Sequence, residues 1–443
     1  MPVAILTNAR LLRTVVLLLL LGSLFLSACQ PIRPASPTAA TPEGHLIVAD
    51  TDAGGLTVFT IPTWEQTGRI EDVTMADHPG FLALPDGRVL FTDNTTQELL
   101  VLDVSGTPTI TVRVAIPGVA IHLGVDATLE HALVSTMANE ETGKGENSLT
   151  MIDLASHEVT VQPIETGEPG LLVGENTIFH RDGGEIGRLQ AFMMDGFGTH
   201  TDATAPYVDI GAYGHGEALV GDYAYIATDD GIDVVNVAGA EPRYVTVLPW
   251  NVSNREGGRG YYMRADSHNT YLWSYLRIVA NPEADASWAN WQDWQNDAYV
   301  IDVKAQTATR FDLGPGLVYR MALSDKYALY SRLHPDGDQA ILVDADPTSA
   351  TFGQITATID LPAVGDAPVA GVEPWEAVGQ RITAITPDGR WGFVSGGGDG
   401  QIHVIDTEQK AIVASLDAGS PLNFGGYMVA VAPGQAVVDR VGR

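Results

Sequence analysis

Three histidines stand at related places in this chain, each shortly before an apolar, strand-like run. His78, His122 and His215 lie 11, 10 and 8 residues ahead of the next such run. Imidazole is a frequent zinc ligand, and a nearby carboxylate such as Asp77 or Glu217 can orient it. If the fold brings the three rings together, they could bind one metal ion; otherwise they fill and hydrate a polar cavity.

Three further side chains occur at comparable places, where other apolar runs begin. Tyr261, Arg320 and Arg381 combine hydrogen-bonding groups with a large contact surface. Aromatic and arginine side chains carry much of the energy of binding sites. We therefore treat these three residues as candidates for contacting a ligand or a partner.

A tryptophan-rich insertion offers a second kind of site. The segment SWANWQDWQND places Trp288, Trp291 and Trp294 three residues apart, on one side of a helical turn or two. Exposed on a loop, the indoles could stack on a sugar or dock a protein. The alternative is a short lid whose indoles pack against the body of the protein.

Signatures of the common enzyme classes are missing from the sequence. It contains no G-x-S-x-G elbow, no H-E-x-x-H pair and no P-loop. A hydrolase with paired carboxylates stays open, because 55 acidic residues are too many to single out a pair. The sequence thus favours a non-catalytic protein over an extracytoplasmic hydrolase or lyase.

Short apolar runs between Gly, Pro, Asn and Asp turns predict an all-β fold from residue 45 onward. Related units of about four strands recur, and most contain a strand that ends like VID, whose last residue is suited to bonding the following turn. A period of 40–50 residues with four strands is typical of a β-propeller blade. We count eight units, and seven if the irregular unit at 177–222 is not a blade. They begin near Leu46, Val89, Ala132, Thr177, Tyr223, Tyr271, Tyr327 and Trp391.

These motifs carry a resemblance to a known family. The VID strands, the Pro-Asp-Gly turns at 85–87 and 387–389, and strands such as ALVS and GFVS resemble the YVTN-repeat propellers of bacterial extracytoplasmic proteins. The resemblance spans residues 45–434 and implies a propeller fold. It does not imply one function, since this scaffold hosts many activities.

A weaker resemblance concerns metal transport. The run Tyr213–Ala218 (YGHGEA) is similar to a His-Gly strand start in the periplasmic zinc-chaperone propellers that supply zinc importers. That resemblance implies zinc as a ligand of His78, His122 and His215. A His/Asp-rich loop of the kind expected in those proteins is not evident.

The order of strands predicts how the ring closes and where it binds. With strands A to D running outward from the channel, the chain opens on a B strand at Leu46 and ends on an A strand at Tyr427–Ala432. We therefore expect both ends in one blade, which removes free sheet edges. All the longer insertions except the C–D segment 195–206 fall in the B–C and D–A loops (137–147, 249–260, 278–297 and 362–380), so we place the binding face there.

The N-terminus predicts export and a lipid anchor. Arg10 and Arg13 precede an apolar run too short for a membrane span, and Leu26-Ser27-Ala28-Cys29 looks like a bacterial lipobox. We expect a signal peptide at 1–28, a lipid on Cys29, a Pro/Ala/Thr-rich linker at 29–44 and a propeller domain at 45–443. The alternative is a chance motif after an ordinary signal or anchor helix.

The net charge of the chain narrows the range of possible binding partners. The chain carries 24 basic and 55 acidic residues, a formal charge of −31, which argues against nucleic acid. The sequence therefore predicts a lipid-anchored binding protein on the outer side of the cell membrane, with zinc binding as the alternative.

Overall fold

The computed structural model describes residues 44–442 except 77, 140–144, 166–168, 202–203, 240, 280–286, 366–377, 433 and 435–439. The expected signal peptide, Cys29 and nearly all of the expected linker lie outside these residues. Within the described ranges, no helix is both long and apolar enough to cross a membrane.

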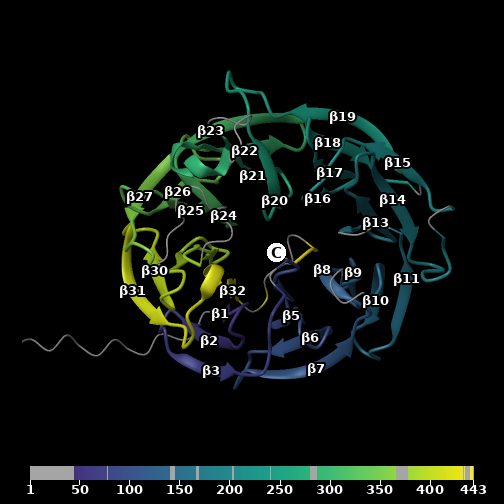
Figure 1. The fold of residues 1–443 in the computed structure, drawn as a ribbon, viewed down its shortest axis with the longest axis horizontal. Helices are drawn as coiled ribbons and strands as arrows, with labels where there is room; N and C mark the ends of the chain where they lie inside the picture. The colour runs from purple at the N-terminus through teal and green to yellow at the C-terminus, as the bar shows by residue number, and fades with distance from the viewer. Residues whose placement is uncertain are drawn as a thin grey trace, which may run out of the picture. The chain divides into compact units, whose positions relative to one another are not determined.

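The chain folds into eight four-stranded antiparallel sheets arranged as the blades of a ring (Figure 1). The alternative of seven blades is therefore wrong, and the irregular unit at 177–222 supplies strands of a true blade. From the channel outward, the first four blades comprise β32 (Tyr427–Val431), β1 (Gly44–Ala49), β2 (Leu56–Ile61) and β3 (Gln66–Ile70); β4 (Leu82–Ala83), β5 (Arg88–Asp93), β6 (Glu98–Asp103) and β7 (Thr109–Ala115); β8 (Val119–Val125), β9 (His131–Met137), β10 (Ser148–Asp153) and β11 (Val159–Pro163); β12 (Gly170–Val173), β13 (Thr177–Asp182), β14 (Gly187–Met193) and β15 (Tyr207–Ile210).

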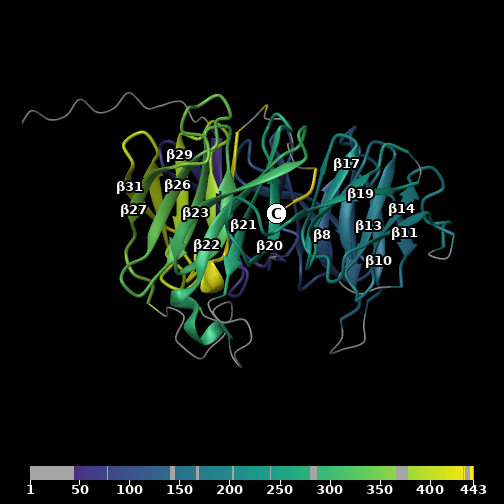
Figure 2. The ribbon, with the colours of Figure 1, turned by 90° about the horizontal axis from the view of Figure 1, so that it is seen from above.

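The second half of the ring repeats this plan, and Figure 2 shows it from the side. A 3-10 helix, η1 (Ser287–Asp293), stands at one edge, in the insertion between β21 and β22. The blades are β16 (Glu217–Val220), β17 (Tyr223–Ala227), β18 (Gly231–Asn236) and β19 (Arg243–Pro249); β20 (Arg259–Ala265), β21 (Tyr271–Ile278), β22 (Gln295–Asp302) and β23 (Thr307–Pro315); β24 (Leu317–Leu323), β25 (Tyr327–Leu333), β26 (Gln339–Asp344) and β27 (Ile355–Asp360); β28 (Thr383–Ile385), β29 (Trp391–Ser395), β30 (Gln401–Asp406) and β31 (Ala411–Asp417), with η3 (Asn423–Gly425) before β32.

Apolar packing between neighbouring blades forms the core. The two middle strands of a blade are nearly continuous buried runs, whereas outer strands such as β7 alternate between exposed and buried residues. Each interface between adjacent blades holds one apolar cluster; Leu46 and Phe393, for example, belong to the cluster between the first and last blades. The ring is thus held by eight similar contacts.

The first and last strands close the ring, as the strand order predicts. β1 pairs with β32 in antiparallel register, with His45 opposite Val431 and Ala49 opposite Tyr427. The innermost strand of the first blade therefore comes from the end of the chain. This blade has the same four-stranded plan as the other seven.

The acidic residues at the ends of the VID-like strands have the structural role predicted for them. Asp103 accepts a hydrogen bond from the amide of Ser105 at 2.8 Å, and Asp406 accepts one from the amide of Gln409 at 2.7 Å. Hydrogen bonds to the Asp406 carboxylate, first of all from Arg390, lower its pKa to about 2. These carboxylates stabilise turns on the ring and are not candidate ligands.

The C-terminal residues return to the channel. Val441 bridges Gly124 of β8, and the amide of Gly442 donates to the Leu123 carbonyl at 2.7 Å. The amide of Val125 in turn donates to the Arg440 carbonyl at 2.8 Å. Residues 440–442 thus pair with the channel-facing edge of the innermost strand of the third blade.

Candidate functional site in the central channel

The three predicted histidines line one cavity of the channel, with a volume of about 380 Å³. It lies where the innermost strands begin, which is the end reached by the D–A loops. We call it the histidine cavity. Its lining contains histidine, tyrosine, arginine and glycine: His78, His122, His215, Gly216, Tyr261, Tyr262, Tyr275, Arg277, Tyr319, Arg320 and Tyr427.

The histidine rings come from three different blades and contact one another. The ring centroid of His78 lies 5.3 Å from that of His122 and 6.0 Å from that of His215. The His215 ring also packs edge-on against Tyr261, with centroids 5.7 Å apart. Residues far apart in the sequence therefore meet because each stands at the start of an innermost strand.

His78 is oriented by a backbone carbonyl. Its Nδ1 lies 2.9 Å from the Ile121 oxygen, which can only accept a hydrogen bond. The proton of the neutral ring is therefore on Nδ1, and Nε2 carries the lone pair. A carbonyl that fixes the tautomer in this way is typical of histidines that bind metal ions.

His122 is held differently, because both its ring nitrogens face acceptors. Nδ1 lies 2.9 Å from the Pro169 carbonyl oxygen, and Nε2 lies 3.1 Å from Oε1 of Glu217. Oε2 of Glu217 accepts a hydrogen bond from Nε of Arg181 at 3.0 Å. All three side chains are buried. The carboxylate that stands beside His215 in the sequence thus orients His122 of another blade.

Bulges at the start of two innermost strands bring pairs of residues to the cavity. The pairing of β20 with β21 shifts between Gly260 and Met263, which leaves Tyr261 and Tyr262 outside the regular register. The pairing of β24 with β25 shifts in the same way around Tyr319 and Arg320. In a regular strand, neighbours point to opposite faces; a bulge relaxes this rule, so both members of each pair line the cavity.

Arg320 is the most unusual charge in the cavity. Within the described part of the chain it has no carboxylate partner, and its Nε is buried without a hydrogen-bond acceptor. Its guanidinium carbon lies 5.4 Å from the centroid of the Tyr319 ring. Among the described residues that line the cavity there is no Asp or Glu.

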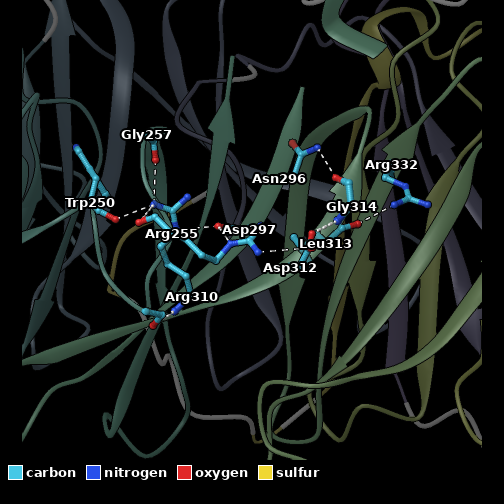
Figure 3. A network of polar contacts seen from close by, with 11 residues as sticks. Trp250, Arg255, Gly257, Asn296, Asp297, Arg310, Asp312, Leu313, Gly314 and Arg332 are labelled. Carbon is cyan, nitrogen blue, oxygen red and sulfur yellow. Dashed lines mark hydrogen bonds and ion pairs between the residues drawn. The ribbon is translucent and has the colours of Figure 1, made fainter. Parts of the chain in front are cut away.

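The second predicted arginine, Arg381, has a structural role. Arg381 is fully buried and pairs with Asp338 at 2.8 Å, and it also donates to the carbonyl of Ser395 at 3.0 Å. Arg310, which the sequence did not single out, resembles it. Its Nε donates to Asp297 at 2.7 Å, and its Nη1 donates to the carbonyls of Trp250 and Gly257 (Figure 3). Such arginines tie loops to the blades.

The tryptophan insertion packs against the body of the protein. Trp291 and Trp294 are only 4% and 2% exposed, and they form an apolar cluster with Leu317 and Leu333. The prediction of exposed indoles is therefore wrong for these two residues, because burial gives more apolar contact than a solvated loop allows. The side chain of Trp288 lies outside the described residues.

The fit of the cavity to a metal ion is partial. Two imidazoles on one tetrahedral Zn²⁺ have ring centroids ~5 Å apart, close to the spacings seen here. However, among the described residues no three His, Cys, Asp or Glu side chains form a group arranged to hold a metal ion. The contact between Nε2 of His122 and Glu217 accounts for this, because that nitrogen is directed at the carboxylate.

Comparisons with known proteins identify the fold alone. No protein-family model matches the chain, and no curated protein matches its sequence significantly. The YVTN-repeat resemblance therefore stays a prediction.

Several solved structures share the propeller fold at low sequence identity. AztD from Citrobacter koseri is similar over 88% of this chain and 98% of its own, with a TM-score of 0.65 and 11% identity. Its apo structure gives a TM-score of 0.61 over 89% of this chain and 100% of its own, at 12% identity. The dihydro-haem d1 dehydrogenase NirN, in complex with DHE, is similar over 92% of this chain and 78% of its own, with a TM-score of 0.61 and 15% identity.

Proposed function

We propose that this protein is an exported binding propeller, held at the outer side of the cell membrane by a lipid on Cys29, and that its ligand enters the histidine cavity. The observation that carries the proposal is the convergence of polar side chains from several blades at one end of the channel. Blade packing does not require them there. The basic and apolar N-terminus and the lipobox-like motif support export.

Zn²⁺ is the first candidate ligand. His78 supports it, because the carbonyl of Ile121 leaves the lone pair on Nε2, and the His215 ring lies 6.0 Å away. His122 could complete a three-histidine site only if its Nε2 left the Glu217 carboxylate and bound the metal ion instead. We therefore expect an exchangeable site that depends on His78 and His215.

Metal analysis of protein purified without a histidine tag tests this candidate. We expect near-stoichiometric zinc in the wild type and its loss in the double variant His78→Ala/His215→Ala. His268→Ala, which removes an exposed histidine outside the cavity lining, is the matched control and should retain zinc. Zinc-free wild-type protein whose melting temperature does not respond to added zinc would rule out the metal.

A further inference from the structure

Arg320 is half-buried, and it differs from the fully buried arginines of the ring in having no carboxylate partner among the described residues. Arg181, Arg310 and Arg381 each pair with a buried carboxylate at 2.7–3.0 Å. Burying a charge is expensive unless it is paired, so an unpaired guanidinium with a buried Nε needs another explanation. A bound anion would supply the missing partner.

The surroundings of Arg320 indicate what kind of anion fits. Tyr262, Tyr275, Tyr319 and Tyr427 lie around it and line the same cavity, together with Tyr261. The guanidinium of Arg277 stacks on Tyr261 and Tyr275, with its carbon 5.5 and 5.9 Å from their ring centroids. Aromatic rings favour a planar, unsaturated ligand body, and ~300–1,000 Å³ is the usual volume for a small organic molecule.

We infer that the histidine cavity binds a small aromatic carboxylic acid, with its carboxylate on the guanidinium of Arg320 and its ring among the tyrosines. The planar fork of arginine donates two parallel hydrogen bonds to a carboxylate, and such bonds are strong where water is excluded. A surface site would suit an organic acid poorly on a protein of charge −31, whereas the described residues that line this cavity include arginines and no acidic side chain.

The inference rests on the proposed function, since it takes the histidine cavity as the ligand site, but it does not require a metal. His78 and His215 would hold Zn²⁺, whereas Arg320 would hold the acid. Zinc binding by the histidines and acid binding by Arg320 can therefore be tested separately.

Binding of benzoate, measured by calorimetry and by the shift in melting temperature, tests the inference. We expect benzoate to bind the wild type, and Arg320→Gln to weaken it about 10- to 100-fold through loss of charge-assisted hydrogen bonds. Arg320→Lys keeps the charge but not the fork, so we expect an intermediate loss. Arg188→Gln, an exposed arginine on β14, is the control and should bind like the wild type.

Acetate and inorganic phosphate complete the test. Acetate shares the carboxylate but has no ring, so we expect weaker binding than for benzoate. Equal binding of benzoate to the wild type and to folded Arg320→Gln would overturn the inference, and so would a preference for phosphate or acetate. Wild-type protein that binds zinc but no benzoate would overturn the organic-acid site and leave the proposed function intact. Binding of neither would count against both.

Discussion

The guanidinium groups of Arg310, which is buried, and of Arg320, which is half-buried, show how one residue type serves two purposes in this ring. Arg310 lies in the network of Figure 3, where Asp297 balances its charge and its Nη1 donates to the carbonyls of Trp250 and Gly257. Arg320 lies in the histidine cavity among tyrosines, and none of the described lining residues is acidic.

The difference separates a group that stabilises the fold from one that is available to a ligand. A paired, hydrogen-bonded ion holds its surroundings together, and removing one partner leaves a buried charge behind. An unpaired ion contributes nothing comparable to the folded state. Residues placed for binding often lower stability in this way.

The largest expected effect is a loss of stability on removing the guanidinium of Arg310. Arg310→Met should lower the free energy of unfolding by about 3–5 kcal/mol, because Asp297 would remain buried with only Arg255 as a partner. Urea-induced unfolding followed by circular dichroism measures this loss. A loss below about 1 kcal/mol would show that the network is not a major source of stability.

Acid pH tests the buried imidazole of His180, whose Nδ1 lies 3.2 Å from the side-chain oxygen of Gln190. His180 is fully buried, and burial lowers its pKa to about 4, well below the ordinary value of 6.5 for histidine. The unfolded chain therefore binds a proton that the folded chain excludes, so this contribution is complete above pH 6.5 and is lost as pH falls toward 4. It amounts to about 3 kcal/mol.

His180→Gln should flatten the decline of stability between pH 6.5 and pH 4 relative to the wild type. The measurement is the urea midpoint at several pH values for both proteins. Parallel curves would contradict a neutral buried imidazole at this position.

The smallest expected effect concerns Arg320 itself. Arg320→Gln should leave stability unchanged or raise it by up to about 1 kcal/mol, since no partner in the described chain loses an ion pair. Thermal unfolding without added ligand measures the change. A loss of stability as large as that of Arg310→Met would show that Arg320 also stabilises the fold, and it would contradict the proposed difference between the two arginines.

Much of the fold could be predicted from the sequence because its signals are local and repeated. Turn residues and short apolar runs recur eight times, so the blades and their closure by the strand at Tyr427 follow from periodicity. The meeting of His78, His122 and His215 follows from the same periodicity, since each stands near the start of an innermost strand.

Contacts between blades could not be predicted in the same way. The bulges that bring Tyr262 and Arg320 into the cavity depend on the pairing register of two strands, and no residue type marks them. Glu217 contacts His122, which belongs to another blade and lies far away in the sequence. The burial of Trp294 depends on apolar neighbours such as Leu333, which lie far away in the sequence.

The pairing of β1 with β32 predicts that the chain tolerates circular permutation. Because the start of β1 lies beside the end of β32, a short linker could join residues 432 and 44 without crossing the ring. New ends could then be opened at an exposed turn such as the one at Asp388, and a circular permutant should rebuild the same eight interfaces. The gene sets the order in which the blades are synthesised, but the closed ring does not depend on which blade comes first.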